Sequence, residues 1–153
     1  MPFALRNGEF EVLLVTARRD GRWILPKGWP ERGEAFCDAA AREAREEAGV
    51  VGDVCAASIG DFTYQKVMRQ GYAVRSRVFV YALRVQETRD SWPEKGERKR
   101  RWVALAAAAP RVKDRGLARL LRGVAENDGA ALHAVLAELD GAHGTTPDLR
   151  PVS

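Results

Sequence analysis

Apolar residues fall in short runs in the first part of the chain, and turn residues separate these runs. Residues 11–18 include four consecutive aliphatic side chains, Asp20-Gly21 supplies a tight turn, and residues 23–25 form a second short run. β-branched and aromatic residues bounded by such turns predict two strands. Residues 26–30 contain two prolines and a glycine, so we expect an irregular loop there.

The composition then changes to that of a helix. Residues 35–48 are mostly Ala, Arg and Glu, which are strong helix formers, and Gly49 follows at the position that favours a helix end. Near the end of the chain, apolar residues spaced i, i+3, i+4 and i+7 predict two more helices. These residues are Leu117, Leu120, Leu121 and Val124 in the first stretch and Leu132, Val135, Leu136 and Leu139 in the second.

Extended chain is predicted between these helices. Residues 72–85 read as one long strand whose centre, residues 78–83, is apolar on both faces. A strand buried on both faces needs layers on both sides of its sheet. The other predicted elements are an interrupted extended run at 50–67, a hairpin turn at 68–71, a charged loop at 89–101 and a last strand at 102–105.

The length and composition fit one globular domain. The chain has 153 residues, of which 46% are hydrophobic, and we place one domain at residues 1–140 followed by a flexible tail at 141–153. No apolar run approaches the roughly 18 residues of a membrane span, and the first ten residues lack the order of a secretory signal. We therefore expect a cytoplasmic protein with no membrane partner. The net charge is only +4, from 25 basic and 21 acidic residues.

Three carboxylates share one face of the first predicted helix. At 100° per residue, Glu43, Glu46 and Glu47 fall within an arc of about 100°. Like charges so close repel one another, and a nearby cation would relieve the repulsion. Salt bridges on a solvated helix are one explanation. A divalent ion is the other, because Mg²⁺ and Mn²⁺ prefer oxygen ligands.

The residues around these glutamates favour the second explanation. They follow a pattern of fixed spacing that begins in the loop before the helix: Gly28, five residues, Glu34, seven residues, Arg42-Glu43, apolar Ala44, one residue, Glu46-Glu47, one residue, Gly49 and apolar Val50. In this pattern the chain resembles the Nudix hydrolases. The resemblance implies an α/β fold (α+β), an α/β/α sandwich with a mixed β-sheet between helices.

The resemblance also implies an activity and the residues that perform it. The activity is the metal-dependent hydrolysis of a phosphoanhydride, with Mg²⁺ or Mn²⁺ as cofactor and a phosphorylated small molecule as substrate. By position, Glu46 and Glu47 would bind metal, and Glu43 would be a third ligand or the base acting on water. The Gly28 carbonyl would be a further ligand, Arg42 would orient the glutamates and Glu34 would support the metal site.

The chemistry of the reaction explains these residue types independently of the resemblance. Water must approach an anion, so a catalyst needs cations that neutralise charge and lower the pKa of the attacking water. Such a reaction needs no side-chain nucleophile. The only histidines are His133 and His143, both after the last predicted strand, so a Ser-His-Asp or Cys-His arrangement has little support.

Residues outside the pattern indicate how a substrate is bound. If residues 68–71 close the hairpin, Tyr64 lies opposite Arg75 and Phe62 opposite Arg77, so aromatic and basic side chains share one surface. Guanidinium and ammonium groups bind phosphate oxygens strongly. The predicted substrate-binding residues are Arg18, Lys27, Tyr64, Lys66, Arg75 and Arg77. The basic residues of the loop at 95–101 are either a further phosphate contact or a solvated surface.

Three short stretches carry a second resemblance. Residues 25–29, 60–66 and 92–102 are similar to the diphosphoinositol-polyphosphate phosphohydrolase branch of the Nudix group, particularly its bacterial relatives. This resemblance implies a diphosphoinositol polyphosphate or a diadenosine polyphosphate as substrate. A general hydrolase of nucleotides and dinucleotides is the alternative enzyme, and a nucleotide-sensing module that does not cleave is the alternative of another class.

Nucleic-acid binding has little support, because the chain has no recognised binding motif. An RNA 5′ end stays open as a substrate, since it is itself a pyrophosphate. The sequence leaves open the number of metals, the identity of the base and the oligomeric state.

Overall fold

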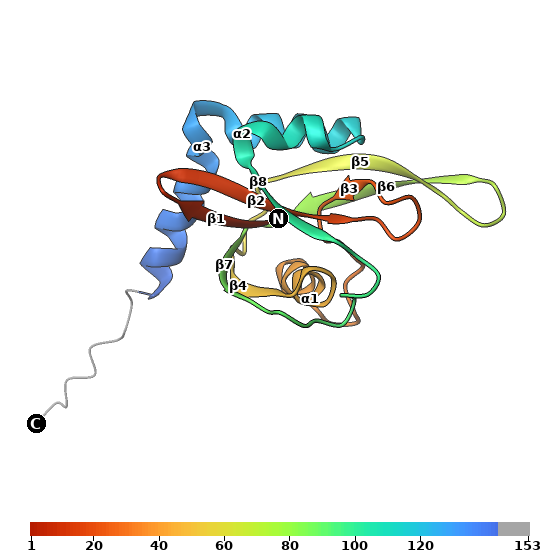
Figure 1. Ribbon diagram of the computed structural model, residues 1–153, viewed down its shortest axis with the longest axis horizontal. Helices are drawn as coiled ribbons and strands as arrows, with labels where there is room; N and C mark the ends of the chain where they lie inside the picture. Colours follow the sequence, from red (N-terminus) through yellow and green to blue (C-terminus); the bar gives the residue numbers. More distant parts are fainter. Residues whose placement is uncertain (144–153) are drawn as a thin grey trace, which may run out of the picture.

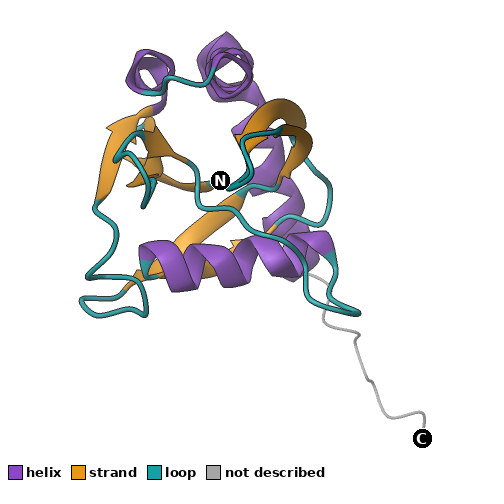
Figure 2. Cartoon of the chain, turned by 90° about the vertical axis from the view of Figure 1, so that its right-hand side faces the viewer, coloured by secondary structure: helices purple, strands orange, loops and turns teal. Residues whose placement is uncertain are grey.

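The computed structural model of the protein describes residues 1–143 and forms three layers. A sheet lies in the middle, helix α1 (Phe36–Ala48) covers one face, and helices α2 (Leu105–Ala108) and α3 (Arg115–His143) cover the other (Figures 1 and 2). A short 3-10 helix, η1 (Ala109–Arg111), joins α2 to the segment before α3. The expected sandwich of helices around a mixed sheet is confirmed. Most of the predicted tail, from residue 144 on, lies outside the described residues.

The central sheet has six strands. They are β1 (Pro2–Arg6), β2 (Glu9–Thr16), β3 (Trp23–Ile24), β4 (Val50–Val54), β7 (Leu83–Thr88) and β8 (Arg100–Ala104). The order is β3-β2-β1-β7-β4, and β8 also pairs with β2. The sheet is mixed because β1 and β7 are parallel whereas the other pairs are antiparallel.

Strand β1 was missing from the sequence prediction. It pairs with β2 through a turn at Asn7 and Gly8, whose φ angles of 51° and 79° are both positive. Positive φ at both central residues is typical of the tight hairpin turn that an Asn-Gly pair favours. Phe3 in β1 is fully buried while Leu5 is 44% exposed, which is the alternation of a half-buried strand.

The predicted long strand at residues 72–85 is wrong. It is two strands, β6 (Ala73–Val80) and β7, which belong to different sheets. Within residues 1–143, strand β6 pairs only with β5 (Gly60–Val67), and the two form a separate ribbon that reaches beyond the central sheet (Figure 1). The chain leaves the ribbon at Tyr81 and Ala82, where the buried Ala82 accepts a hydrogen bond from the Cys55 N–H at 2.9 Å.

The pairing within this ribbon differs by one residue from the prediction. Tyr64 lies opposite Ser76, and Val67 lies opposite Ala73. The loop is one residue longer than expected, because the Met68 N–H donates to the Tyr72 carbonyl and residue 72 belongs to the turn. A shift of one residue moves every side chain of a strand to the other face relative to its partner. The assumed common face of Tyr64 and Arg75 is therefore wrong.

Strand β2 supplies core residues to both layers. Val12 and Leu14 pack in the cluster below α2 and α3, whereas Leu13 and Val15 pack in the cluster against α1. All four side chains are fully buried. The first predicted helix and both C-terminal helical stretches are confirmed; α3 contains a break at residues 126–129 between the two stretches. Within the described residues, we find no helix of the length and apolarity that a membrane crossing requires.

Candidate functional site

Helix α1 carries the predicted glutamates in its last two turns. Ala44 and Ala48 are buried against the sheet, which places Glu47 beside the core with only 5% of its surface exposed. The helix ends at Gly49, whose φ of 66° is a left-handed conformation that glycine adopts without steric cost. The acidic residues are thus fixed on a rigid element with a defined end.

Arg42 contacts three of the four glutamates of the pattern. Its Nη1 donates to Glu43 at 2.8 Å and to Glu46 at 3.3 Å, and its Nε donates to Glu34 at 2.9 Å. Nη2 donates to the Trp29 carbonyl at 3.1 Å, which ties the preceding loop to the helix. The Arg42 guanidinium also holds the pKa of the Glu34 carboxyl below its usual range. These contacts join Arg42 to Glu34, Glu43 and Glu46, and the roles of Arg42 and Glu34 stay predictions.

Glu47 is the most buried of the acids. Its carboxylate accepts hydrogen bonds from Arg98 Nη2 at 3.2 Å and from the Lys27 N–H at 3.3 Å. Burial raises the pKa of Glu47 to about 7, and the nearby carboxylates of Glu43 and Glu94 add to this rise while Arg98 opposes it. The raised pKa shows that Arg98 does not fully offset the burial of Glu47 and its repulsion from the other acids.

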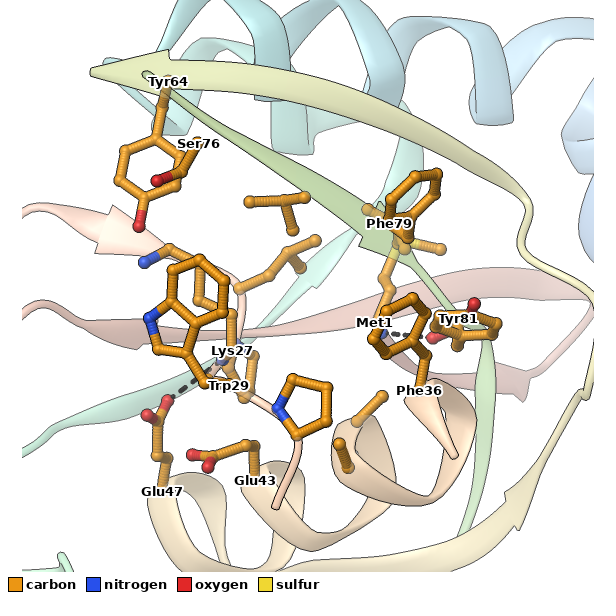
Figure 3. A pocket seen from close by; sticks show the side chains of 18 of the residues that line it. Met1, Lys27, Trp29, Phe36, Glu43, Glu47, Tyr64, Ser76, Phe79 and Tyr81 are labelled. Carbon is orange, nitrogen blue, oxygen red and sulfur yellow. Dashed lines mark hydrogen bonds between the residues drawn. The ribbon is translucent and has the colours of Figure 1, made fainter. Parts of the chain in front are cut away.

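Gly28 lies directly against the Glu43 carboxylate. A Cβ atom at residue 28 would lie only 2.3 Å from Glu43 Oε1, a distance that real Cβ atoms do not show. Only glycine leaves room for the acid here. Figure 3 shows Glu43 and Glu47 side by side below the loop that carries Lys27 and Trp29.

These groups fit a hard divalent cation by their chemistry. Glu43, Glu47 and Gly28 line one cavity and offer only oxygen ligands, which Mg²⁺ and Mn²⁺ prefer. Among residues 1–143, no three acidic, histidine or cysteine side chains are already close enough together to hold an ion. The reason is visible in the contacts, since Arg42 binds Glu43 and Glu46 whereas Arg98 binds Glu47. An ion would have to compete with these arginines for the carboxylates.

The cavity beside the acids has a volume of about 550 Å³. Its walls come from the loop before α1, from the start of α1 and from the β5–β6 ribbon (Figure 3). Three aromatic side chains at its edge are unusually exposed for their type: Trp29 at 71%, Phe36 at 55% and Phe79 at 41%. The rings of Phe36 and Phe79 are nearly parallel with centroids 6.0 Å apart.

Most of the predicted substrate-binding residues lie at this cavity. Arg18, Lys27, Tyr64, Lys66 and Arg77 line it, and the Lys27 ammonium sits 4.5 Å from the centre of the Tyr64 ring. Arg75 does not line it, and its pairing partner is Gln65 and not Tyr64. The prediction that Arg75 lies opposite Tyr64 in the site is therefore wrong.

Both predicted substrate-binding arginines that line the cavity already have acidic partners. Arg77 is bound to Asp61 through two hydrogen bonds of 3.0 and 3.1 Å, and Arg18 lies within 3.6 Å of both Glu94 and Glu97. Lys27 and Lys66 have no acidic partner among the described residues. These two lysines are the cations most available to a substrate phosphate.

The charged loop at residues 89–99 holds the end of α1. At the C-terminal end of α1, the carbonyls of residues 46–49 have no hydrogen-bond partner within the helix. Each of them accepts a hydrogen bond from this loop or from the start of β8. The donors are Trp92 Nε1 to Glu47 at 3.1 Å, the Glu94 N–H to Glu46 at 3.1 Å, Arg100 Nη1 to Ala48 at 2.9 Å and the Arg89 N–H to Gly49 at 2.8 Å. The Arg100 guanidinium also stacks on the Trp92 ring at 3.9 Å.

This loop contains residues of the site that sequence reasoning did not assign to it. Trp92 fixes the last turn of the acidic helix, and Glu94 adds a fourth carboxylate near Glu47. Arg98, which the sequence placed in a basic loop, is only 8% exposed and is paired with both Glu47 and Glu94. A tryptophan in an otherwise charged loop was the signal that could have indicated a buried contact.

Comparison with known proteins identifies the family. The NUDIX domain model matches residues 3–123, and the chain belongs to this family. It is 37% identical over 103 residues to Nudix hydrolase 21, chloroplastic, of Arabidopsis thaliana, covering 67% of this chain and 50% of that protein. It is 39% identical over 103 residues to diphosphoinositol polyphosphate phosphohydrolase 3-beta of Bos taurus, covering 65% of this chain and 58% of that protein. The chain thus spans about half the length of the curated relatives it matches.

Solved structures show the same fold. A binary complex of C. elegans Ap4A hydrolase superposes with a TM-score of 0.57 at 22% identity, covering 90% of this chain and 93% of that one. At this identity the likeness shows the fold.

Proposed function

We propose that this protein is a metal-dependent pyrophosphohydrolase that cleaves a phosphoanhydride bond in a highly phosphorylated small molecule. One observation carries the proposal. Glu43 and Glu47 face a cavity of about 550 Å³ beside Gly28, and Arg42 holds the remaining glutamates of the pattern around them. Burial is the largest cause of the raised pKa of Glu47, and the Glu43 and Glu94 carboxylates add to it. A divalent cation bound here would favour the charged carboxylate.

We assign roles to the chain's own residues from their places in the pattern. Glu46, Glu47 and the Gly28 carbonyl would hold Mg²⁺ or Mn²⁺, and Glu43 would complete the ligand set or take a proton from water. A divalent ion supplies charge neutralisation and a more acidic water molecule. Arg42 orients Glu43 and Glu46 through its Nη1. Lys27 and Lys66 bind substrate phosphates at the cavity wall.

The cavity wall favours a substrate that contains a planar base. Base stacking on an aromatic side chain stabilises a complex by about 1–3 kcal/mol, and Trp29, Phe36 and Phe79 offer exposed rings. A diadenosine polyphosphate has such a base at each end. Ap4A is the substrate named for the C. elegans structure.

A diphosphoinositol polyphosphate is the second candidate substrate. The bovine relative is named for it, and the basic side chains Arg18, Lys27 and Lys66 at the cavity supply the charge it requires. An inositol ring is not planar, so it would gain nothing from stacking. A general hydrolase of nucleotides linked to other groups would use the aromatic rim in the same way as a dinucleotide hydrolase.

A substrate panel tests the proposal. Diadenosine tetraphosphate, an inositol pyrophosphate, ADP-ribose, a nucleoside triphosphate and 5′-triphosphorylated RNA are compared with Mg²⁺ and with Mn²⁺. Product analysis in ¹⁸O-labelled water shows which phosphorus atom is attacked. Cleavage of diadenosine tetraphosphate in preference to the others is expected, whereas preferred cleavage of the inositol compound would refute the argument from the aromatic rim.

A pair of variants tests the glutamates themselves. Glu46→Gln should nearly abolish turnover while leaving the circular dichroism spectrum and thermal midpoint close to those of the parent. Glu9→Gln is the matched control, since Glu9 is exposed on β2 and away from the cavity. Wild-type turnover in Glu46→Gln would eliminate the proposed role, and tight ligand binding without hydrolysis in either metal would favour a sensing module.

The cytoplasmic location stays a prediction, and several relatives carry the words chloroplastic or mitochondrial in their names.

A further inference from the structure

A second cavity lies beside β5 and shares no lining residue with the cavity next to the acids. It has a volume of about 550 Å³ and lies between β5 and the first half of α3. Gly60, Gly116 and Gly123 line it, and their lack of side chains leaves the space open. Helix α3 approaches β5 closely here, because a Cβ on Gly116 would lie 3.2 Å from the Thr63 carbonyl oxygen.

Basic side chains line and extend this cavity. Arg115 and Arg119 line it, and Arg122 continues the same stripe, since residues at i, i+4 and i+7 share one face of a helix. Arg111 and Lys113 precede them in the chain. Residues 111–122 thus hold five basic residues and one acidic residue, a net charge of +4 that equals the net charge of the whole chain.

The charge of this segment is not offset by neighbouring acids. Across residues 1–143, none of its five basic side chains has an ion pair or a hydrogen bond to a carboxylate. Asp114 caps α3 by accepting a hydrogen bond from the Leu117 N–H at 2.8 Å. Asp61 lines the cavity, but two hydrogen bonds from Arg77 neutralise it.

The surroundings restrict what can bind. No large exposed hydrophobic side chain lies within residues 111–122, so the surface lacks the apolar groups that insert into a membrane. Among residues 1–143, Phe62 is the one aromatic residue that lines the cavity, and it is only 7% exposed, so the described lining offers no aromatic face on which a base could stack. A cavity of this size suits a compact ligand more than a long polymer.

We propose that the cavity between β5 and α3 is a second, non-catalytic site that binds a compact ligand carrying several phosphate groups. The guanidinium groups of Arg115 and Arg119 contact the phosphates, and Arg122 adds longer-range attraction. The proposal does not depend on the hydrolase activity, because its contacts lie outside the acidic site and involve no divalent ion.

Titration with tripolyphosphate, without divalent metal, tests this site. Amide signals of Gly60, Gly116 and Gly123 are followed by NMR, and calorimetry gives the affinity. The double variant Arg115→Ala/Arg119→Ala should weaken binding at this site by roughly tenfold or more, since a hydrogen bond to a charged group contributes about 1.5–3 kcal/mol. Turnover on the best substrate of the panel should not change.

A matched variant and three further probes make the result decisive. Arg32→Ala/Arg69→Ala removes the same charge from exposed arginines outside the cavity and should leave the affinity unchanged. Equal losses in both double variants would show nonspecific attraction and overturn the proposal. Amide shifts confined to Gly28 and its neighbours would also overturn the proposal. An affinity for citrate equal to that for tripolyphosphate would do the same. Tighter binding to RNA of equal phosphate content, or to vesicles containing anionic lipid, would overturn the assignment to a compact ligand.

Discussion

The contact between Gly28 and Glu43 leads to a sharp prediction for Gly28→Ala. The new Cβ would lie 2.3 Å from Glu43 Oε1, whereas ordinary contacts begin at 3.4 Å. The carboxylate must therefore move by roughly 1 Å. A misplacement of about 1 Å in a catalytic group can reduce the rate by roughly 100-fold, which corresponds to about 2.7 kcal/mol in the activation free energy.

Stability should change little in this variant. The atoms that must move are the end of a flexible side chain, and the φ angle of Gly28 is not positive, so alanine fits its backbone. Steady-state kinetics should show a fall in kcat of about two orders of magnitude with a thermal midpoint within a few degrees of the parent. Gly96→Ala is the control, because its new methyl group would have no neighbouring atom within 4 Å and its φ is also not positive. A kcat of Gly28→Ala within threefold of the parent would refute the reasoning.

Three other variants test features around the site and in the fold. Trp92→Phe loses a hydrogen bond to the last turn of α1 but keeps an aromatic ring, so urea unfolding should show a loss of about 1 kcal/mol. The Arg84 guanidinium lowers the pKa of Asp53, so Asp53→Asn should cost about 1 kcal/mol at pH 7. This difference should begin to shrink as the pH falls below the usual carboxyl pKa near 3.8, and it should disappear only below the lower pKa that Asp53 has in the folded protein. Gly129→Ala should destabilise by about 2–4 kcal/mol in the same assay, because φ is 77° and a Cβ would lie 2.6 Å from the Phe10 ring. An unchanged midpoint in any of these variants would contradict the contact on which it is based.

The local sequence determined some elements and not others. Helix α1 was predictable because its composition and the glycine at residue 49 both act locally. The division of residues 72–85 into two strands was not predictable from the sequence. An apolar run looks the same whether it continues in one sheet or passes from one sheet to another. Strand β1 was predictable in principle from Asn7-Gly8, a strong hairpin signal.

The residues of the candidate site were likewise predictable only where local spacing along the chain determines their positions. Spacing along one helix placed Glu43, Glu46 and Glu47 together, and the structure shows Arg42 bound to the first two. The wall of the cavity depends on pairing between strands, where one extra loop residue changes which side chains face it. The hydrogen bond from Trp92 to the Glu47 carbonyl joins residues that are 45 positions apart in the chain, and no periodic pattern in the sequence predicts such a contact.

The separation of the β5–β6 ribbon from the central sheet has a consequence for how specificity can diverge. No strand of the described chain other than these two shares their hydrogen-bond ladder. Deleting or inserting one residue in the turn at 68–72 would exchange the inward and outward side chains of one strand without touching the acidic helix. Related proteins could in this way acquire different substrates through a single change in turn length while retaining the same hydrolytic apparatus.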